Sequence, residues 1–119
     1  MEITTREINN VELITVMGRV DSVAATGLAK ALDAASRRGK HKIVVDMSGL
    51  EYMSSAGFRA LGDAQRESQR HPGGEVVLAR VPALIHEALE MVGFTEYFHI
   101  EDTVAAALAF AEGSQGASR

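Results

Sequence analysis

The chain has 119 residues, of which 46% are hydrophobic and 24% are charged, as is typical of a single globular domain. Its 12 basic residues against 16 acidic ones give a formal net charge of −4, and 5% of the residues are aromatic. A mildly acidic chain with few aromatic rings lacks both the positive charge and the stacking surface on which nucleic-acid binding depends, so we expect no direct contact with nucleic acid.

The first predicted element is a hairpin of two antiparallel strands. Residues 11–17 are rich in β-branched side chains, residues 2–9 alternate loosely between apolar and polar, and Asn9-Asn10 between them is a turn signal. We expect Gly18 to break the second strand. The sheet to which this hairpin belongs should therefore be antiparallel at its N-terminal edge.

A helix and a central strand are expected next. Asp21 or Ser22 is a suitable N-cap for a helix whose apolar residues recur at i, i+4, i+7 and i+11, and Gly39 is its expected end. Residues 42–47 then form an almost unbroken apolar run, which is typical of a strand buried on both faces. We therefore place this strand at the centre of the sheet and expect a loop over residues 48–53.

The second half of the chain begins with two adjacent serines at a predicted helix N-terminus. Ser54 and Ser55 precede Ala56 and Gly57, and from Phe58 a helical pattern resumes. The elements expected after this helix, in chain order, are a strand over residues 75–79, a helix from Pro82 to Gly93, a short link or edge strand over residues 94–100, and a helix over residues 103–112 capped by Asp102.

The alternation of strands with helices predicts an α/β fold with right-handed crossovers. We expect a single-layer mixed sheet, antiparallel at the N-terminal hairpin and otherwise mostly parallel, packed with about four helices. Residues 1–112 would form this one domain. Residues 113–119, which are rich in small side chains, would form a flexible C-terminal tail.

Several classes of protein are disfavoured by what the chain lacks. It has no cysteine, which removes disulfides, thiolate nucleophiles and thiolate metal sites and fits a reducing compartment. Its longest apolar run, residues 104–111, is far shorter than the roughly 20 residues of a membrane-spanning helix. Residues 1–10 do not resemble a signal peptide. We therefore expect a cytoplasmic protein that is not inserted into a membrane.

The motifs of common enzyme classes are also missing. There is no G-x-G-x-x-G or G-x-x-x-x-G-K phosphate loop, and neither serine has the glycine two residues earlier that a hydrolase elbow requires. The histidines, which we expect at surface or interface positions, are too scattered for a local metal motif: His41, His71, His86 and His99. Asp46, a lone carboxylate, is expected to accept hydrogen bonds from loop N–H groups. We therefore predict a binding protein without enzyme activity, metal or cofactor.

One segment carries most of the information about function. The stretch VVDMSGLEYMSSAGFRAL, residues 44–61, resembles the signature of the STAS domain, and in particular that of the anti-sigma factor antagonists. In that signature a hydrophobic strand leads through Asp-x-Ser and a hydrophobic loop to Asp-Ser-Ser-Gly-Leu at a helix start. Gly18-Arg19-Val20-Asp21 resembles the family's segment before the first helix, and Val92-Gly93-Phe94 resembles its turn near the C-terminal end. The resemblance thus extends over almost the whole chain.

The resemblance implies a binding module controlled by phosphorylation. Members of this family bind an anti-sigma factor while one serine is unmodified, and thereby release a sigma factor. The anti-sigma factor is usually a GHKL-type serine kinase that phosphorylates this serine and ends the interaction, and a PP2C-type phosphatase removes the phosphate. Aligned on Gly57, the regulated serine is Ser55. Ser54 stands where the family commonly has Asp and is a less favoured acceptor, while Ala56 replaces a second Ser and Phe58 a Leu.

The residue types at this position fit such a switch on physical grounds. An exposed serine at a helix N-terminus lies beside unpaired N–H groups and the positive end of the helix dipole, both of which favour a phosphoryl group. A phosphate adds about 1.5 to 2 negative charges, so a partner packed against the unmodified hydroxyl would lose its fit. The expected partner-binding residues are Asp21, Ser54, Ser55, Ala56, Gly57, Phe58, Arg59 and Arg66.

Each of these positions also has an ordinary structural alternative. The serines and Asp21 are alternatively plain helix caps. Gly57 is expected to let the helix approach the sheet closely whatever the function, and Phe58 to lie in the core. A basic stripe on the helix after the serines is either a solvated face or a rim that contacts an acidic partner. Its members, at i, i+7 and i+11, are Arg59, Arg66 and Arg70.

Two rival functions are considered beside the antagonist. The first is a STAS-fold adaptor subunit of a membrane transporter or other assembly that has no phosphorylation cycle. The second is a small-ligand or nucleotide-binding protein that uses the loop after the central strand, a placement that α/β sheets favour. The lack of a glycine-rich loop argues against this second rival.

Overall fold

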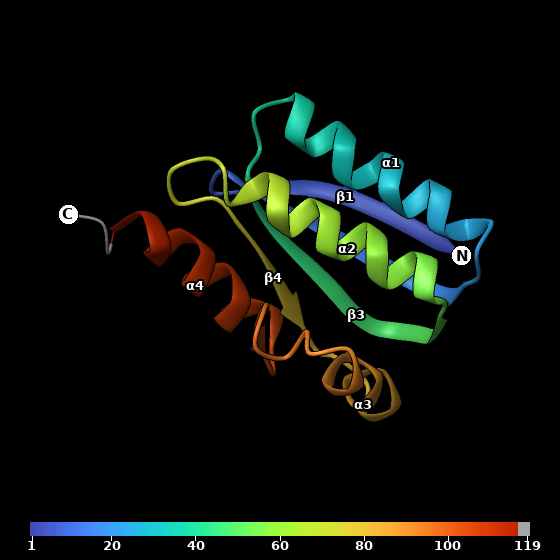
Figure 1. Ribbon diagram of the computed structural model, residues 1–119. Helices are drawn as coiled ribbons and strands as arrows, with labels where there is room; N and C mark the ends of the chain where they lie inside the picture. Colours follow the sequence, from blue (N-terminus) through green and yellow to red (C-terminus); the bar gives the residue numbers. More distant parts are fainter. Residues whose placement is uncertain (117–119) are drawn as a thin grey trace.

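The computed structural model of the protein describes residues 1–116, which form one sheet with helices on both faces (Figure 1). Its elements in chain order are β1 (Glu2–Ile8), β2 (Val11–Val20), α1 (Ala24–Arg37), β3 (Lys42–Met53), α2 (Ser55–Ser68), β4 (Glu75–Ala79), α3 (Ala83–Met91), β5 (His99–Glu101) and α4 (Val104–Gly116). Each strand and helix predicted from the sequence is present, and the predicted link or edge strand after α3 ends in the short strand β5.

The strands make a single mixed sheet in the order β1-β2-β3-β4-β5. β1 and β2 are antiparallel, and every later neighbouring pair is parallel. Right-handed crossovers that advance in one direction along a sheet place their helices on the same face, so α1, α2 and α3 cover one face. α4 packs on the opposite face. The predicted fold class is therefore confirmed.

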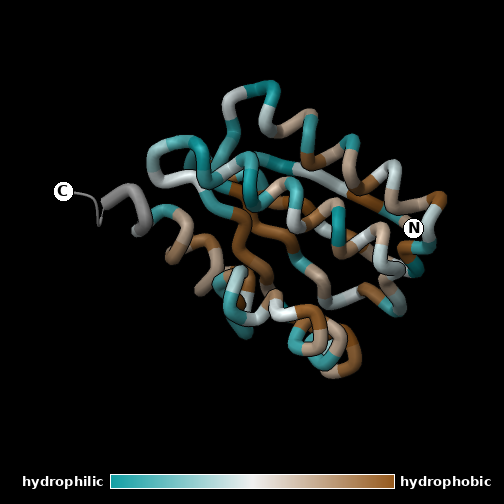
Figure 2. Tube along the Cα trace, viewed as in Figure 1, coloured by the Kyte–Doolittle hydropathy of each residue, from teal (hydrophilic) through white to brown (hydrophobic). Residues whose placement is uncertain are grey.

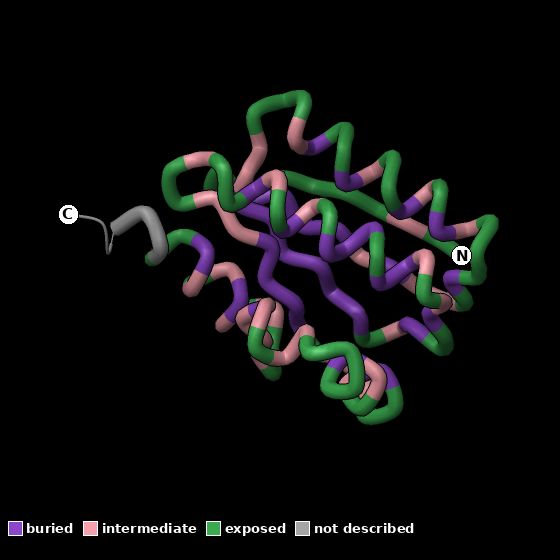
Figure 3. Tube along the Cα trace, in the orientation of Figure 1, coloured by how far each residue is buried: buried purple, intermediate pink, exposed green. Residues whose placement is uncertain are grey.

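Two hydrophobic layers form the core, one on each face of the sheet. The larger layer lies under α1, α2 and α3 and includes Ile43, Val45 and Met47 of β3. The smaller layer lies under α4 and includes Val44 of the same strand. Alternate residues of β3 are thus buried on opposite faces, which explains its unbroken apolar run. Figures 2 and 3 show β3 and β4 as an apolar, buried centre between the helices.

Strands β2 and β3 are both longer than the sequence predicted. β2 continues through Gly18, so the expectation that Gly18 ends the strand is wrong. Gly18 has φ +88°, and the register between the two strands shifts beside it, which lets the pairing continue past the irregularity. Residues 48–53 are likewise not a loop, because they extend β3 to Met53 and pair with the end of β2. This extension carries the chain from the middle of the sheet to the start of α2.

The last helix differs from its prediction at both ends. Thr103, directly before α4, caps it: the Thr103 Oγ1 accepts a backbone hydrogen bond of 3.0 Å from the first turn. The predicted cap, Asp102, lies one residue too early for this role. α4 runs to Gly116, so residues 113–116 of the predicted tail are helical. Residues 117–119 of that tail lie outside the described residues.

A buried glutamine ties α2 to the sheet. Gln65 is 0% exposed, its Oε1 accepts from the Val76 N–H at 2.7 Å, and its Nε2 donates to the Tyr97 carbonyl at 2.9 Å. One side chain therefore pairs two backbone groups, one at the start of β4 and one in the segment before β5. The spacing of Gln65 from Leu61 and Ser68, at i, i+4 and i+7, places it on the core-facing side of α2. That spacing is a signal from which its burial could have been predicted.

Two histidines stack where the α1–β3 and α2–β4 connections meet. The rings of His41 and His71 are parallel, with centroids 3.4 Å apart, and the His71 Nε2 lies 3.3 Å from the Glu67 Oε2. Burial, and then the neighbouring His71, lower the pKa of His41, although Glu67 acts in the opposite direction. Within residues 1–116 the buried Nδ1 of His41 has no hydrogen-bond partner. Protonation of His41 is therefore unfavourable in the folded protein.

We expect the protein to lose stability as the pH falls below about 6.5, the ordinary pKa of histidine. The folded state holds the pKa of His41 below that value, so on acidification the unfolded state takes up this proton first. Urea unfolding from about pH 7.5 down to pH 5 measures the effect. His41→Asn should reduce the slope of the unfolding free energy against pH. Equal slopes for His41→Asn and the unaltered protein would contradict the prediction.

Candidate functional site

The two adjacent serines lie where β3 ends and α2 begins. β3 ends at Met53, Ser54 is the N-cap, and Ser55 is the first residue of the helix. The predicted placement of the serines at a helix N-terminus is thus confirmed. Met53 pairs with Val20 at the end of β2, and the Ser54 N–H donates to the Val20 carbonyl at 2.8 Å. The backbone that leads into Ser55 is therefore held by the centre of the sheet.

The two serine hydroxyls differ in what they contact. The Ser54 Oγ accepts from the Gly57 N–H at 3.3 Å and so caps α2, and the residue is half-buried. Ser55 is exposed, and its side chain has no hydrogen-bond partner in the described part of the chain. A modification of Ser54 would disturb a cap, whereas a modification of Ser55 would not. The Ser55 hydroxyl is therefore the better placed of the two to meet another protein.

The start of α2 is electrostatically suited to an anion. The first N–H groups of a helix have no acceptor within it, and the aligned peptide dipoles give this end a partial positive charge. No acidic residue occupies the first turn of α2, so this charge is not neutralised there. A phosphate on Ser55 would lie beside this positive end, and the fold would tolerate it.

Two of the predicted partner-binding residues face the core instead. Gly57 is buried, and a Cβ built there would lie 2.6 Å from the Met53 Cγ, closer than real Cβ contacts. Phe58 is 9% exposed, and its ring packs edge-on against that of Phe94 with centroids 6.5 Å apart. These two residues therefore do not present a contact surface in the folded protein. Their predicted structural roles, close helix–sheet approach and core packing, are confirmed.

Asp21 lies at the neighbouring strand end. It follows Val20, whose carbonyl binds the Ser54 N–H, so Asp21 and the serines share one edge of the sheet. Asp21 is exposed, and its Oδ1 accepts from the Ala24 N–H at 2.8 Å. The predicted capping role of Asp21 is confirmed, and its position beside the serines agrees with the grouping predicted from the sequence.

The same edge exposes apolar surface that sequence reasoning missed. Val23, just before α1, is 81% exposed, and Tyr52, one residue before the end of β3, is 40% exposed. The Arg19 guanidinium carbon lies 4.6 Å from the centroid of the Tyr52 ring. Nothing in the local pattern distinguished these two residues from core residues, because both types are also common in buried positions.

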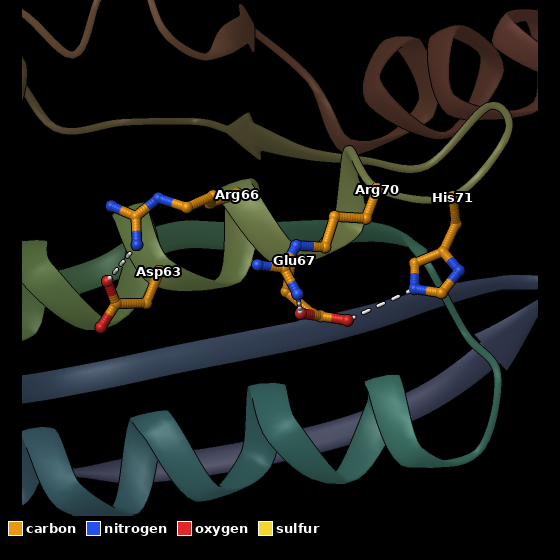
Figure 4. A network of polar contacts seen from close by, with 5 residues as sticks. All are labelled: Asp63, Arg66, Glu67, Arg70 and His71. Carbon is orange, nitrogen blue, oxygen red and sulfur yellow. Dashed lines mark hydrogen bonds and ion pairs between the residues drawn. The ribbon is translucent and has the colours of Figure 1, made fainter.

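Two of the three arginines of the predicted stripe lie close to an acid three residues earlier, and Arg70 lies just beyond the end of α2. The Arg66 Nη1 lies 3.4 Å from the Asp63 Oδ1, and the Arg70 Nη1 lies 3.4 Å from the Glu67 Oε1. Figure 4 shows both pairs along α2, each acid one turn before its arginine. Arg59 is exposed and, among residues 1–116, has neither an ion pair nor a side-chain hydrogen bond. The stripe therefore leaves one unpaired cation near the serines.

Asp46 has a structural role within β3, beside the end of β4, where it pairs with Ala79. Its Oδ1 accepts from the Ser48 N–H at 3.1 Å, as predicted, and its two oxygens also bind Arg80 at 3.2 and 2.8 Å. Burial alone would raise the pKa of Asp46, but the hydrogen bonds from Arg80 and Ser48 outweigh burial and hold that pKa below its usual range. Arg80, which has φ +54°, could not be linked to Asp46 from the sequence, because the two are far apart along the chain.

A groove with a volume of about 550 Å³ lies between α1 and α2. Its lining includes the apolar residues Leu32, Ile43, Ala60 and Ala64 and the acidic residues Asp33 and Asp63. The groove is on the helical face, away from the segment on which the small-ligand alternative depended. That segment, residues 48–53, is strand and not a loop, so the proposed ligand-binding loop does not exist.

Among residues 1–116, no group of three or more histidine, cysteine, aspartate or glutamate side chains could hold a metal ion. No helix of this part of the chain is long and apolar enough to cross a membrane. His41 and His71 stack on each other, but His86 lies on α3 and His99 on β5.

Comparison with known proteins gives a family match and a relative of similar length. The family model of the STAS domain matches residues 2–107. A protein of Bordetella bronchiseptica that bears the name "Putative anti-sigma factor antagonist BtrV" is 30% identical over 109 residues, which cover 92% of this chain and 93% of that protein. The match to BtrV therefore spans nearly the full length of both chains.

Solved structures share the fold at low sequence identity. An anti-sigma factor antagonist from Mycobacterium paratuberculosis is 19% identical, with a TM-score of 0.84 over 93% of each chain. The Bacillus cell fate determinant SpoIIAA in its phosphorylated form is 16% identical, with a TM-score of 0.73 over 91% of this chain and 97% of that chain. A sulfate transporter family protein from Wolinella succinogenes is 21% identical, with a TM-score of 0.72 over 90% of this chain and 88% of that chain. At these identities the likenesses establish the fold alone.

Proposed function

The chain belongs to the STAS domain family, and from this premise we propose that it is an anti-sigma factor antagonist switched by phosphorylation of Ser55. Unmodified, it binds an anti-sigma factor and so releases a sigma factor; phosphorylated, it no longer binds. The observation that carries the proposal is the exposed, unbonded hydroxyl of Ser55 beside a Ser54 hydroxyl already used as a cap. The name of the similar protein BtrV and the existence of a phosphorylated form of SpoIIAA support it.

The proposed switch adds negative charge at a position where the fold tolerates it. A phosphate adds about 1.5 to 2 negative charges and a strongly hydrated group at a position that held a neutral hydroxyl. The start of α2 stabilises that group within the chain, but a partner packed on the hydroxyl must desolvate it. A partner carboxylate about 4 Å away would add roughly 4 kcal/mol of repulsion per charge pair at an effective dielectric near 20. Such a penalty is large enough to end a specific interaction.

The proposed partner-binding face is the sheet edge around the start of α2 together with the exposed side of that helix. Its contact residues are Asp21, Ser54, Ser55, Ala56, Arg59 and Arg66, with Gly57 and Phe58 supporting them from the core. The exposed apolar side chains of Val23 and Tyr52 extend this face. Buried apolar contacts surrounded by polar ones are the usual composition of a protein–protein interface.

In this proposal the protein is a substrate and a binding partner rather than an enzyme. A GHKL-type serine kinase, which is also the anti-sigma factor, transfers the phosphoryl group to the Ser55 Oγ. A PP2C-type phosphatase hydrolyses the ester and restores binding. All three proteins would act in the cytoplasm.

Incubation with such a kinase and MgATP is expected to add one phosphate, on Ser55. Intact-protein mass spectrometry followed by peptide mapping measures the amount and the position. Ser55→Ala should gain no phosphate, because the Ser54 hydroxyl is engaged with the Gly57 N–H. Ser54→Ala is the matched control and should still be modified, since Ser55 is unchanged.

Two outcomes would overturn the assignment in different ways. A phosphate on Ser54 in the Ser55→Ala variant, at a rate close to that of the unaltered protein, would move the switch by one residue. No phosphate on either serine with a kinase that binds the protein would favour the adaptor function, since the same fold occurs in a sulfate transporter family protein.

A further inference from the structure

Arg59 is the one arginine of the α2 stripe that the described residues leave without an ion pair. Arg66 on α2 and Arg70 just after it are each paired with a carboxylate three residues earlier. Three residues before Arg59, at the spacing of both pairs, stands Ala56, and four residues before it stands Ser55; neither residue is charged. Arg59 therefore has no acid one turn before it, and phosphorylation of Ser55 would place a negative charge four residues before it.

The helix geometry directs Arg59 toward Ser55. Residues at i and i+4 lie on the same face with Cβ atoms about 5 to 6 Å apart, and long helical side chains lean toward the N-terminus. An ion pair is also more favourable when the acid is N-terminal to the base. Asp63, the acid at i+4 on the other side of Arg59, is in the less favourable orientation and already binds Arg66. A phosphate on Ser55 would therefore be the preferred partner of Arg59.

From these observations we propose that Arg59 is the intramolecular receptor of the phosphate on Ser55. The inference rests on the proposed phosphorylation of Ser55 and adds a second component to the switch. An arginine presents a planar fork of N–H donors that matches phosphate oxygens, so the contact is a charge-assisted hydrogen bond as well as an ion pair. The contact between Arg59 and the phosphate makes and breaks no covalent bond.

The consequence for recognition is that one modification changes two features of the binding face. In the unmodified protein a partner meets a neutral hydroxyl and an unpaired guanidinium, which can bind a partner carboxylate. In the phosphorylated protein the hydroxyl is replaced by a dianion, and the guanidinium is occupied within the chain. Phosphorylation thus adds a repulsive group and withdraws an attractive one at the same time.

The test uses protein with phosphoserine placed at position 55 during translation, so that neither a kinase nor a partner is needed. A ³¹P NMR titration follows the second ionisation of this phosphate, which the Arg59 cation favours. Arg59→Gln is expected to raise the titration midpoint by about half a pH unit, as for a helical ion pair strengthened by charge-assisted hydrogen bonds. Arg59→Lys should retain part of the effect, because it keeps the charge but not the fork.

Arg66→Gln is the matched control, since it removes the same charge from the same helix far from Ser55. Its midpoint should stay close to that of the protein with both arginines. The difference between the two variants should shrink in about 1 M salt, where the Debye length is about 3 Å. The helix N-terminus contributes equally in all variants, so it cancels from the comparison.

A midpoint that is the same for Arg59→Gln and Arg66→Gln at low salt would overturn the inference. That result would leave the proposed function standing, because Ser55 could still be phosphorylated and the phosphate recognised without Arg59. Conversely, failure of the kinase experiment would contradict the proposed function without altering the titration, because the phosphate is installed independently. The two proposals therefore fail separately.

Discussion

Ser55→Asp is expected to lower the affinity for an anti-sigma factor by about a hundredfold or more while leaving the fold intact. Aspartate places a negative charge at the exposed start of α2, where the helix N-terminus accepts it but a partner packed on the hydroxyl does not. A repulsion of roughly 4 kcal/mol per charge pair, even if partly screened, corresponds to that loss. Isothermal titration calorimetry with the partner measures the Kd, and urea unfolding verifies the fold.

The neighbouring residue supplies a matched control for this experiment. Ser54→Asp introduces the same charge one residue earlier, where a carboxylate can accept the Gly57 N–H in place of the serine oxygen. Its affinity should therefore fall less than that of Ser55→Asp, because the Gly57 N–H holds this carboxylate within the chain. Ser55→Ala should also bind, and it should do so whether or not kinase and ATP are present. Unchanged affinity in Ser55→Asp would refute the charge switch.

Gln65→Leu is expected to cost about 3 kcal/mol of unfolding free energy. Leucine fills a similar volume, but it leaves the Val76 N–H and the Tyr97 carbonyl without the hydrogen bonds of 2.7 and 2.9 Å that Gln65 provides. A buried backbone group without a partner costs about 1 to 3 kcal/mol, and here two are affected. The midpoint and slope of urea unfolding give the value.

Gln69→Leu is the control for this substitution, because Gln69 directly follows α2 and is exposed. Its effect should lie within about 0.5 kcal/mol, as for most surface positions. If Gln65→Leu lowered the unfolding free energy no more than Gln69→Leu does, the hydrogen bonds of Gln65 that link α2 to β4 would not stabilise the fold as argued.

Prediction from the sequence was most accurate for the strands that are covered on both faces, because this burial gives a simple apolar pattern. Residues 42–47 and 75–79 are mostly apolar, with Lys42, Asp46 and Glu75 as the exceptions, because parallel strands in the middle of a sheet are covered on both faces. The continuation of β3 over residues 48–53 was not predictable in this way. That segment contains Ser48 and Gly49 and pairs with β2 through an irregular register, so its pattern resembles a loop.

At the candidate site, too, features set by neighbouring residues were predictable, and contacts between residues far apart along the chain were not. The serines were placed at a helix start because a helix pattern and a suitable cap are adjacent in the sequence. The Ser54 hydroxyl caps the helix through one hydrogen bond of 3.3 Å from the Gly57 N–H. No sequence pattern specifies which of the two serine hydroxyls forms this bond. The contacts of Asp46 with Arg80 and of Gln65 with Tyr97 join distant parts of the chain. Such contacts follow from the topology rather than from local sequence.

The twelve-residue strand β3 also bears on how quickly a signal could pass through this protein. Since the same strand forms the middle of the sheet and delivers Ser55 to the surface, the presenting backbone cannot rearrange locally without opening the core. The two chemical states should therefore superimpose, and no slow folding step should follow either the gain or the loss of the phosphate. The response time of such a circuit would then be governed by the turnover of the kinase and the phosphatase and by partner dissociation, not by the antagonist.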